Sequence, residues 1–430
     1  MNKNFLKNNF ISLTGAFLGG LLGYLFHFVV SRQLTVAQYG ELQAVSSLAA
    51  FFGVFSAALS FFIVKYSSVL ALHNDRKGQV HFLELIAKKF RMPVFGIIVV
   101  FAAIAPFLKK FLHLSDYFGL FSIGLSVILG IYFSFYLNVL QGWKNFFALA
   151  AVGTATAAAK FFSGWAFAAF IPSASFAAFS FLVSAAAGLF LAKAYFRRQW
   201  PPPREKEENE NNWRENYFSG ESFRKSFFQI FFFSLALAAV GNLDIIAVKN
   251  VASAETAGYY AALGVLGKIL LWFNLAVVAT LLPDAFSSGH TKKPVESRLV
   301  LSSYALIFCL SVPSIFFFRF FSDFPVRLLF GGKYVAVSRE LWLFGLMAAV
   351  LSCFLLEAKL SMARKDFRAT WLLGISAVLL ASLVFWRHDT LREIASLVTL
   401  SFFIGWISVF FFNLRHRFAL DSRDKKELRS

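Results

Sequence analysis

The chain has 430 residues, of which 58% are hydrophobic and 15% charged, and its net charge is +19. Soluble domains carry about 25% charged residues, so this composition excludes a soluble protein whose surface is covered by water. The 58 phenylalanines suit helices whose outer faces meet lipid. The positive charge would ordinarily suggest nucleic acid, but it lies between apolar runs, and we expect no nucleic acid partner.

The first apolar run, residues 10–31, follows the basic residues Lys3 and Lys7. It is too long for the apolar part of a signal peptide and lacks a small-residue cleavage pattern. A helix that crosses the bilayer core needs about 20 apolar residues. Runs of that kind lie at 10–31, 42–64, 92–108, 117–140, 146–171, 174–194, 226–248, 258–283, 299–318, 340–358, 368–386 and 393–413. The sequence therefore predicts an all-α integral membrane protein with about twelve transmembrane helices.

Polar segments divide these runs into two sets of six. Residues 79–90 have an amphipathic pattern and predict a helix lying on the inner membrane face. The longest polar stretch, from Arg197 to Lys225, contains three consecutive prolines and cannot bury enough apolar surface to order itself. We therefore predict an N-terminal six-helix lobe at 1–195, a cytoplasmic polar linker at 196–224, a C-terminal six-helix lobe at 225–417 and a cytoplasmic basic tail at 418–430.

The distribution of Lys and Arg predicts the orientation. With both termini in the cytoplasm, the cytoplasmic segments hold thirty of the forty-two basic residues and the opposite side holds ten. The other two, Lys160 and Lys268, fall inside spans. Because basic residues concentrate in cytoplasmic loops, this bias predicts a protein of the cytoplasmic (inner) membrane with both termini cytoplasmic.

Two pairs of short, similar segments relate the two halves of the chain. Residues 37–42 (AQYGEL), after the first span, resemble residues 255–260 (ETAGYY), after the seventh, at an offset of 218 residues. Residues 144–146 (KNF) resemble residues 365–367 (KDF) at an offset of 221. Both pairs occupy the same topological place in each half, so we predict a parallel repeat of the kind found in many transporters. Gly40 and Gly258 should then occupy equivalent positions.

Several segments carry a family resemblance. Residues 242–248 (NLDIIAV), residues 254–262 (AETAGYYAA), Lys268 and the pair Leu282-Pro283 look like spans seven and eight of polysaccharide flippases. The opening, with Arg32-Gln33-Leu34 followed by Tyr39-Gly40, resembles the same family, which belongs to the multidrug/oligosaccharidyl-lipid/polysaccharide exporter (MOP) superfamily. The resemblance covers nearly the whole chain.

This resemblance implies two six-helix bundles around a central cavity that opens alternately to each side of the membrane. The implied cargo is a polyprenyl-pyrophosphate-linked oligosaccharide for polysaccharide or lipopolysaccharide biosynthesis. Other polysaccharide-assembly proteins are then possible partners beside the lipid bilayer. Multidrug or small-solute exporters of the same superfamily also have twelve helices, and they remain the alternative. A membrane-embedded glycosyl transferase or ligase is less favoured, because the longest outer segment, about 319–339, holds a single acid, Asp323.

Four charged residues are candidates for a substrate cavity. Lys160 and Lys268 lie well inside spans five and eight, where a charge costs about 3 kcal/mol and usually faces a cavity or a partner. Asp244, in span seven, is either a proton-coupling carboxylate or the ion-pair partner of Lys268. Arg32 closes span one at the outer interface. Gly15, Gly19 and Gly23, four residues apart, should let another helix approach closely.

Catalytic and cofactor signatures are not found. Gly267-Lys268 and Gly332-Lys333 lack the first glycine and the hydroxyl of a phosphate-binding loop. The seven histidines are scattered, and Cys309 and Cys353 lie in apolar runs without metal-site or disulfide spacing. We therefore expect no catalytic residues, no metal and no cofactor, so transport would have to be driven by an ion gradient or by consumption of the cargo.

Overall fold

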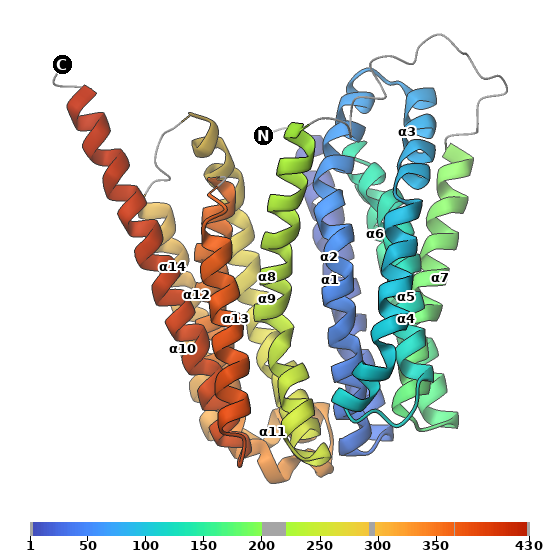
Figure 1. Cartoon of the computed structure of the whole chain (residues 1–430), viewed down its shortest axis with the longest axis vertical. Coiled ribbons are helices and arrows are strands. Elements are labelled where there is room, and N and C mark those ends of the chain that lie inside the picture. Colours follow the sequence, from blue (N-terminus) through green and yellow to red (C-terminus); the bar gives the residue numbers. More distant parts are fainter. Residues whose placement is uncertain (1–2, 200–220, 292–296, 365, 428–430) are drawn as a thin grey trace. The chain divides into compact units, whose positions relative to one another are not determined.

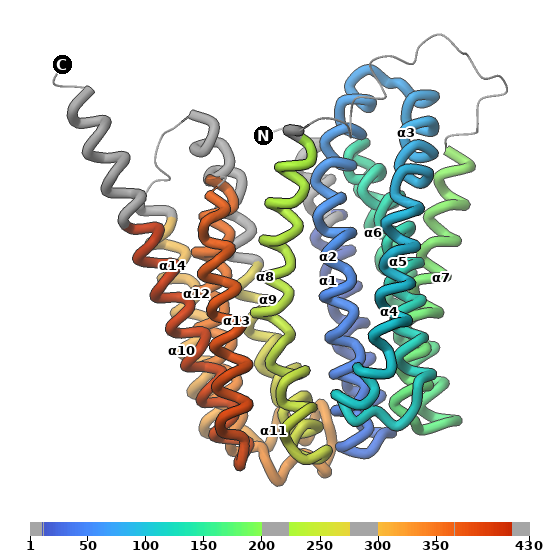
Figure 2. The backbone as a smooth tube through the Cα atoms, viewed as in Figure 1, coloured from blue at the N-terminus to red at the C-terminus, as the bar shows by residue number. Residues whose placement is uncertain are grey.

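The protein is described from a computed structural model. It describes the backbone of residues 3–199, 221–291, 297–364 and 366–427 (Figure 1). Figure 2 draws in grey every residue whose placement is uncertain. Side chains are described for residues 11, 13–199, 223–275, 300–364 and 366–414. Most of the predicted linker at 196–224 and the side chains of the predicted tail at 418–430 lie outside these described residues.

The described chain is helical throughout (Figure 1). Its helices are α1 (Lys3–Gln33), α2 (Val36–Leu72), α3 (Arg76–Lys89), α4 (Arg91–Phe111), α5 (Phe118–Gly142), α6 (Phe146–Phe170), α7 (Ala174–Gln199), α8 (Glu221–Val251), α9 (Ala254–Thr291), α10 (Ser297–Phe320), α11 (Asp323–Leu329), the 3-10 helix η2 (Gly332–Glu340), α12 (Leu341–Ala363), α13 (Ala369–Trp386) and α14 (Leu391–Glu427). Within the described residues, 12 helical segments are long and apolar enough to cross a membrane. The predicted all-α, multi-pass membrane fold is confirmed.

Many large apolar side chains point outward, as expected for lipid-facing helices. Phe170 is 85% exposed and Phe190 is 71% exposed, and Trp371 and Phe107 are exposed in the same way. In water such patches would drive association. In a bilayer they meet hydrocarbon.

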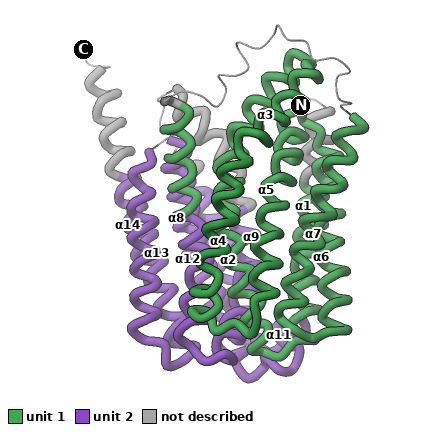
Figure 3. The backbone as a smooth tube through the Cα atoms, turned by 45° about the vertical axis from the view of Figure 1, so that its right-hand side comes forward, with its two compact units in different colours: residues 1–235 green, residues 236–430 purple. Residues whose placement is uncertain are grey.

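The chain divides into two compact units, Met1–Leu235 (unit 1) and Ala236–Ser430 (unit 2), coloured separately in Figure 3. The division falls inside α8. The N-terminal part of α8 packs on the apolar core of unit 1, where the Phe223 and Phe227 rings meet Phe62 and Phe55.

Unit 1 is built on close approaches between its spanning helices. Helix α1 packs along α6, α2 along α5, and α7 along both α5 and α6. At Gly142 the backbones of α5 and α2 come so close that an added Cβ would lie 2.6 Å from Ser67 Cβ. Gly15 allows a similar approach to Ala150 of α6, whereas nothing lies within 4 Å of a Cβ added at Gly19 or Gly23. The predicted close-packing role is therefore confirmed for Gly15 and wrong for the other two glycines.

The amphipathic segment does form a helix, α3. Asp75 caps it by accepting a hydrogen bond from the Gly78 backbone N–H at 2.7 Å. The expectation that it lies flat on the membrane face is not met. Only a local break at Phe90 separates it from α4, and α3 continues the direction of that helix (Figure 1). Its apolar face is buried against the α2–α5 core rather than offered to lipid.

Unit 2 has a matching arrangement. Helix α9 packs along α12, α12 along α14, and α13 along α14, while α10 covers α9 and α12. Gly267 of α9 lies against the backbone of α12, because an added Cβ would be 2.7 Å from the Phe344 carbonyl oxygen.

Hydrogen bonds at two turns support the predicted repeat. The Thr35 hydroxyl caps α2 by accepting from the Gln38 backbone N–H, and Ser253, 218 residues later, caps α9 by accepting from the Thr256 N–H. Gly40 and Gly258 thus occupy the same position after their caps. The second pair of similar segments shares a backbone hydrogen bond to the carbonyl five residues earlier. The Asn145 N–H donates to Leu140 O, and the Asp366 N–H donates to Ser361 O.

Candidate functional site

Lys160 lies within unit 1, on a stretch of α6 rich in alanine, glycine and threonine. These small side chains leave room for the aromatic residues of the neighbouring helices. The ammonium group lies 4.4 Å from the ring centroid of Phe26 in α1 and 3.9 Å from that of Phe181 in α7. The two rings meet edge to face, 5.7 Å apart. Within the described part of the chain Lys160 forms no ion pair. The contacts that stabilise its charge there are those with the faces of the Phe26 and Phe181 rings.

Lys268 lies in unit 2, half-buried on α9. Its ammonium donates a hydrogen bond to the backbone carbonyl of Gly241 in α8 at 3.3 Å. A glycine at that position leaves the carbonyl accessible to the long side chain. Among the described residues no carboxylate forms an ion pair with Lys268, so the pairing with Asp244 left open by the sequence is not formed.

Asp244 is almost fully buried, with 3% of its surface exposed. Its Oδ2 accepts a hydrogen bond from the Tyr260 hydroxyl at 3.0 Å, and that hydroxyl also lies 3.7 Å from Met347 Sδ. Oδ1 is buried without a hydrogen-bond partner in the described structure. A buried carboxylate with one unsatisfied oxygen is costly.

Arg32 is exposed in the last turn of α1. It lies six residues beyond Phe26, which corresponds to about 9 Å along the helix. The structure therefore does not bring Arg32 to the Phe26 and Phe181 rings that contact Lys160.

A further polar cluster in unit 2 was not predicted. Glu357 of α12 is fully buried and accepts from the Tyr304 hydroxyl of α10 at 2.8 Å and from the Asn413 side chain of α14 at 2.5 Å. The Trp406 indole donates to the Tyr304 hydroxyl at 3.0 Å, and the Ser361 hydroxyl donates to Asn413 at 2.8 Å. We call these five residues the Glu357 network. The sequence feature that could have indicated this network is one acid near the end of the predicted span 340–358, together with polar residues in two other predicted spans.

The chemistry of these sites is electrostatic. Lys160 in unit 1 and Lys268 in unit 2 lie inside predicted spans and form no ion pair with a described carboxylate, and unit 2 adds the buried acids Asp244 and Glu357. Among the described residues, no group of three or more His, Cys, Asp or Glu side chains is placed to hold a metal ion.

Comparisons with solved structures place the fold. The lipid II flippase MurJ in an inward closed conformation matches with a TM-score of 0.68 at 12% identity, covering 96% of this chain and 90% of that one. A MOP superfamily transporter from Pyrococcus furiosus, described as having a binding pocket of reverse polarity that suggests a different function, gives 0.67 at 10% identity, covering 97% and 96%. An inward-facing multidrug resistance MATE transporter of that superfamily gives 0.61 at 13% identity, covering 96% and 99%. At these identities the likeness concerns the fold alone.

No curated protein matches the chain in sequence. The family model for polysaccharide biosynthesis proteins does match, over residues 5–290, which is more than half of the chain. That match agrees with the fold, with the 12 candidate spans in the described residues and with the transporters and flippases among the structural neighbours. The chain is thus a multi-pass membrane protein that belongs to the polysaccharide biosynthesis protein family.

Proposed function

We propose that this protein is a flippase that moves a polyprenyl-pyrophosphate-linked oligosaccharide across the cytoplasmic membrane by alternating access, for polysaccharide biosynthesis. The sugars and phosphates cross through the protein while the polyprenyl tail stays in lipid. The protein carries this cargo without catalysing a change in it. Enzymes that assemble polysaccharide on either side of the membrane are then its functional partners.

The observation that carries the proposal is the pair of in-membrane lysines, Lys160 and Lys268. A lysine at mid-membrane costs about 3 kcal/mol on insertion scales, and it normally persists because it has a partner or a function. Neither lysine forms an ion pair within the described residues; one rests on the rings of Phe26 and Phe181, the other on a backbone carbonyl. A pyrophosphate passing each lysine would supply the missing anion in turn, and the low-dielectric surroundings would strengthen the attraction.

Asp244 supports a driving force for this cycle. We propose Asp244 as the proton-coupling carboxylate, because it is buried among the spans and its Oδ1 has no described partner. Proton uptake from one side and release to the other would couple transport to a proton gradient. The same residue would serve the second candidate function, ion-coupled export of drugs or small solutes, which differs in cargo and not in coupling.

The test uses purified protein in liposomes with a fluorescent polyprenyl-pyrophosphate-linked saccharide. Lys160→Ala and Lys268→Ala should each lower the flipping rate at least tenfold, and Lys→Arg at either position should retain more activity because it keeps the charge. Lys109→Ala is the matched control, since Lys109 also lies over an aromatic ring, that of Tyr117 at 4.3 Å, but in the last turn of α4. The proposal fails if both alanine variants flip the cargo at the parental rate.

A cationic dye in the same liposomes separates the two cargo classes. If the protein is a flippase for the lipid-linked oligosaccharide, the dye should not move, and excess dye should leave the flipping rate of the saccharide unchanged. Dye export that a proton gradient drives and Asp244→Asn abolishes, without saccharide flipping, would establish the exporter instead.

We also infer that both termini face the cytoplasm, from the thirty-to-ten distribution of basic residues. In a Cys309→Ser background, which removes the exposed native thiol, cysteines at Lys88 and Lys110 should label from opposite sides. A membrane-impermeant maleimide added to intact cells should modify Lys110→Cys and spare Lys88→Cys. The reverse pattern would invert the orientation.

A further inference from the structure

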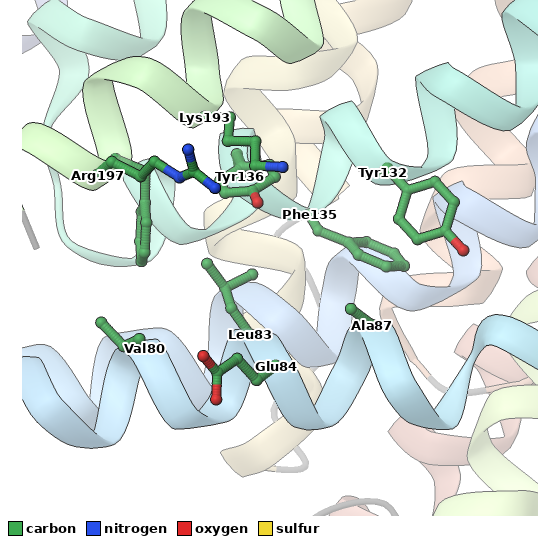
Figure 4. A pocket seen from close by; sticks show the side chains of 10 residues that line it. Val80, Leu83, Glu84, Ala87, Tyr132, Phe135, Tyr136, Lys193 and Arg197 are labelled. Atoms are coloured by element: carbon green, nitrogen blue, oxygen red, sulfur yellow. The ribbon is translucent and has the colours of Figure 1, made fainter. Parts of the chain in front are cut away.

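Unit 1 contains a pocket of about 280 Å³ between α3, α5 and α7 (Figure 4). That volume is close to the lower end of the range for small-molecule sites, about 300 Å³. The α3 wall includes Leu83, Glu84 and Ala87, the α5 wall includes Tyr136, and α7 supplies Lys193 and Arg197. The wall is therefore apolar and aromatic with three charged groups at its rim. None of the transport residues proposed above lines this pocket.

The two basic residues act as one group. Lys193 and Arg197 are four residues apart, so they lie on the same face of α7 one turn apart. Figure 4 shows both side chains beside the Tyr136 ring, on the α7 side of the pocket opposite Glu84. The Phe196 ring packs edge to face on Tyr136 at 5.5 Å and fixes that wall. Within the described residues neither cation is ion-paired, and Glu84 forms no ion pair either.

The pocket lies at a depth that suits a lipid head group. Along α7, Lys193 is about 29 Å and Arg197 about 35 Å beyond Ala174, at 1.5 Å per residue. The hydrocarbon core of a bilayer is about 30 Å thick. A helix that enters the core near Ala174 therefore places these cations where it leaves, at the level of the phosphates. Basic pockets between transmembrane helices bind lipid head groups at this level.

We propose that this pocket binds the head group of a membrane phospholipid that carries both a phosphate and a primary ammonium, as in phosphatidylethanolamine. Lys193 and Arg197 hold the phosphate, and the Glu84 carboxylate accepts hydrogen bonds from the ammonium. The acyl chains lie along the apolar outer surfaces of α4 and α5. Two cations and one carboxylate complement this head group better than a purely anionic one, which would leave Glu84 beside a second negative group.

The test measures lipid binding and does not depend on cargo. Purified protein in detergent is titrated with phosphatidylethanolamine, phosphatidylglycerol or phosphatidylcholine, and bound lipid is counted by native mass spectrometry. Phosphatidylethanolamine should bind most tightly, since phosphatidylcholine lacks N–H donors and phosphatidylglycerol lacks the cation. The double variant Lys193→Gln/Arg197→Gln should weaken its binding about 30-fold, because each basic residue near a lipid surface contributes about fivefold to affinity. Glu84→Gln should remove most of the preference over phosphatidylcholine.

Two further variants separate a built pocket from general surface charge. Lys88→Gln/Arg198→Gln removes one exposed cation each from α3 and α7 that does not line the pocket, and it should leave binding unchanged. Ala87→Phe keeps every charge but fills the pocket and should lower binding as much as the charge variant. The proposal is overturned if the control double variant loses as much affinity, if phosphatidylglycerol binds as well as phosphatidylethanolamine, or if soluble phosphoethanolamine binds as tightly as the lipid.

Discussion

In unit 1, α2 packs along α5, α5 along α7, and α6 along α7; in unit 2, α9 packs along α12, α12 along α14, and α13 along α14. These are the same pairs when the spanning helices of each unit are counted in chain order. The first helices differ. Helix α1 packs along α6 over much of its length, whereas α8 is shared between the units by the division at Leu235. The pairing is thus repeated among the second, fourth, fifth and sixth spanning helices of each unit, and it differs for the first.

The polar interiors differ much more than the packing. Among the described residues, unit 1 buries one acid, Glu41, at the start of α2, where it accepts from both the backbone N–H and the hydroxyl of Ser115. Unit 2 buries Asp244 and Glu357 and surrounds the second with donors from two other helices. Lysines inside the spans occur in both units.

This contrast follows from the physics of burial. Apolar packing between two helices needs only small residues at the crossing, and many sequences meet that need. A buried carboxylate needs donors at defined positions, so each network must be assembled separately. Two copies of a bundle can therefore keep one shape while only one of them acquires proton-binding chemistry. On the proposed function, both units contact the anion and unit 2 couples it to protons.

The largest effect should follow from disturbing the shared packing. A Cβ at Gly267 would lie 2.7 Å from the Phe344 backbone oxygen, and one at Gly142 would lie 2.6 Å from Ser67 Cβ, while Gly264 has open space. Overpacking against a rigid neighbour costs about 1–3 kcal/mol, so Gly267→Ala and Gly142→Ala should both destabilise. Gly264→Ala, on the same helix as Gly267, should be neutral or slightly stabilising. Thermal unfolding in detergent measures all three, and equal behaviour of Gly267→Ala and Gly264→Ala would contradict the close approach.

The next effect tests the difference between the interiors. Asn413 donates to both the side chain and the backbone oxygen of Glu357, so Asn413→Leu should destabilise unit 2 by about 2 kcal/mol by stranding buried acceptors. Among the described residues, Asn138 of unit 1 donates only to the Ser60 hydroxyl, and Asn138→Leu should cost about half as much. Adding Glu357→Leu to Asn413→Leu should recover part of the lost stability, because the buried carboxylate is then removed, while the Tyr304 hydroxyl still loses its acceptor. Chemical or thermal unfolding that ranks the two asparagines equally would remove the proposed asymmetry.

The sequence is sufficient for the parts of this fold that local rules determine. Apolar runs of sufficient length indicate the spans, and the similarities of residues 37–42 to 255–260 and of 144–146 to 365–367 indicate the repeat. The orientation of α3 was not predictable in the same way. Its amphipathic pattern shows that one face is buried, but the covering surface, a protein core rather than lipid, is supplied by distant helices.

The polar contacts within the bundles depend on helix rotation, which spacing along the chain does not define. Sequential antiparallel helices bring Asp244 and Lys268 into one neighbourhood, yet Lys268 reaches the Gly241 carbonyl and Asp244 reaches Tyr260. Glu357 was missed for a related reason. An acid one residue from the end of a predicted span suggests an interfacial residue until Tyr304 and Asn413, over fifty residues away, are brought to it.

A smaller effect should appear where the Phe26 and Phe181 rings contact Lys160 in unit 1. A Cβ at Gly164 would lie 2.2 Å from the Phe26 ring, so Gly164→Ala should shift the ring that holds Lys160 and cost about 1 kcal/mol of stability. On the proposed function the flipping rate should fall a fewfold, although no charge has changed. Gly153→Ala, on the same helix with nothing within 4 Å, should leave both stability and flipping unaltered. If Gly164→Ala unfolds at a higher temperature than the parent or flips the cargo at the parental rate, the Phe26 and Phe181 rings do not position Lys160.

The smallest effect bears most directly on how far the two interiors differ. Each unit buries a tyrosine in the first two turns of its second helix: Tyr260 donates to Asp244 at 3.0 Å, and Tyr39 accepts from the Gln43 amide at 2.8 Å. Hydrogen bonds to ionised groups are about twice as strong as those between neutral groups. Double-mutant cycles on stability should therefore give a coupling of about 1 kcal/mol for Tyr260→Phe with Asp244→Leu, and about half of that for Tyr39→Phe with Gln43→Leu. Equal couplings would mean that the contact to Asp244 is no stronger than a hydrogen bond between neutral groups, and the buried acid would then give unit 2 no advantage over unit 1 as the site of proton coupling.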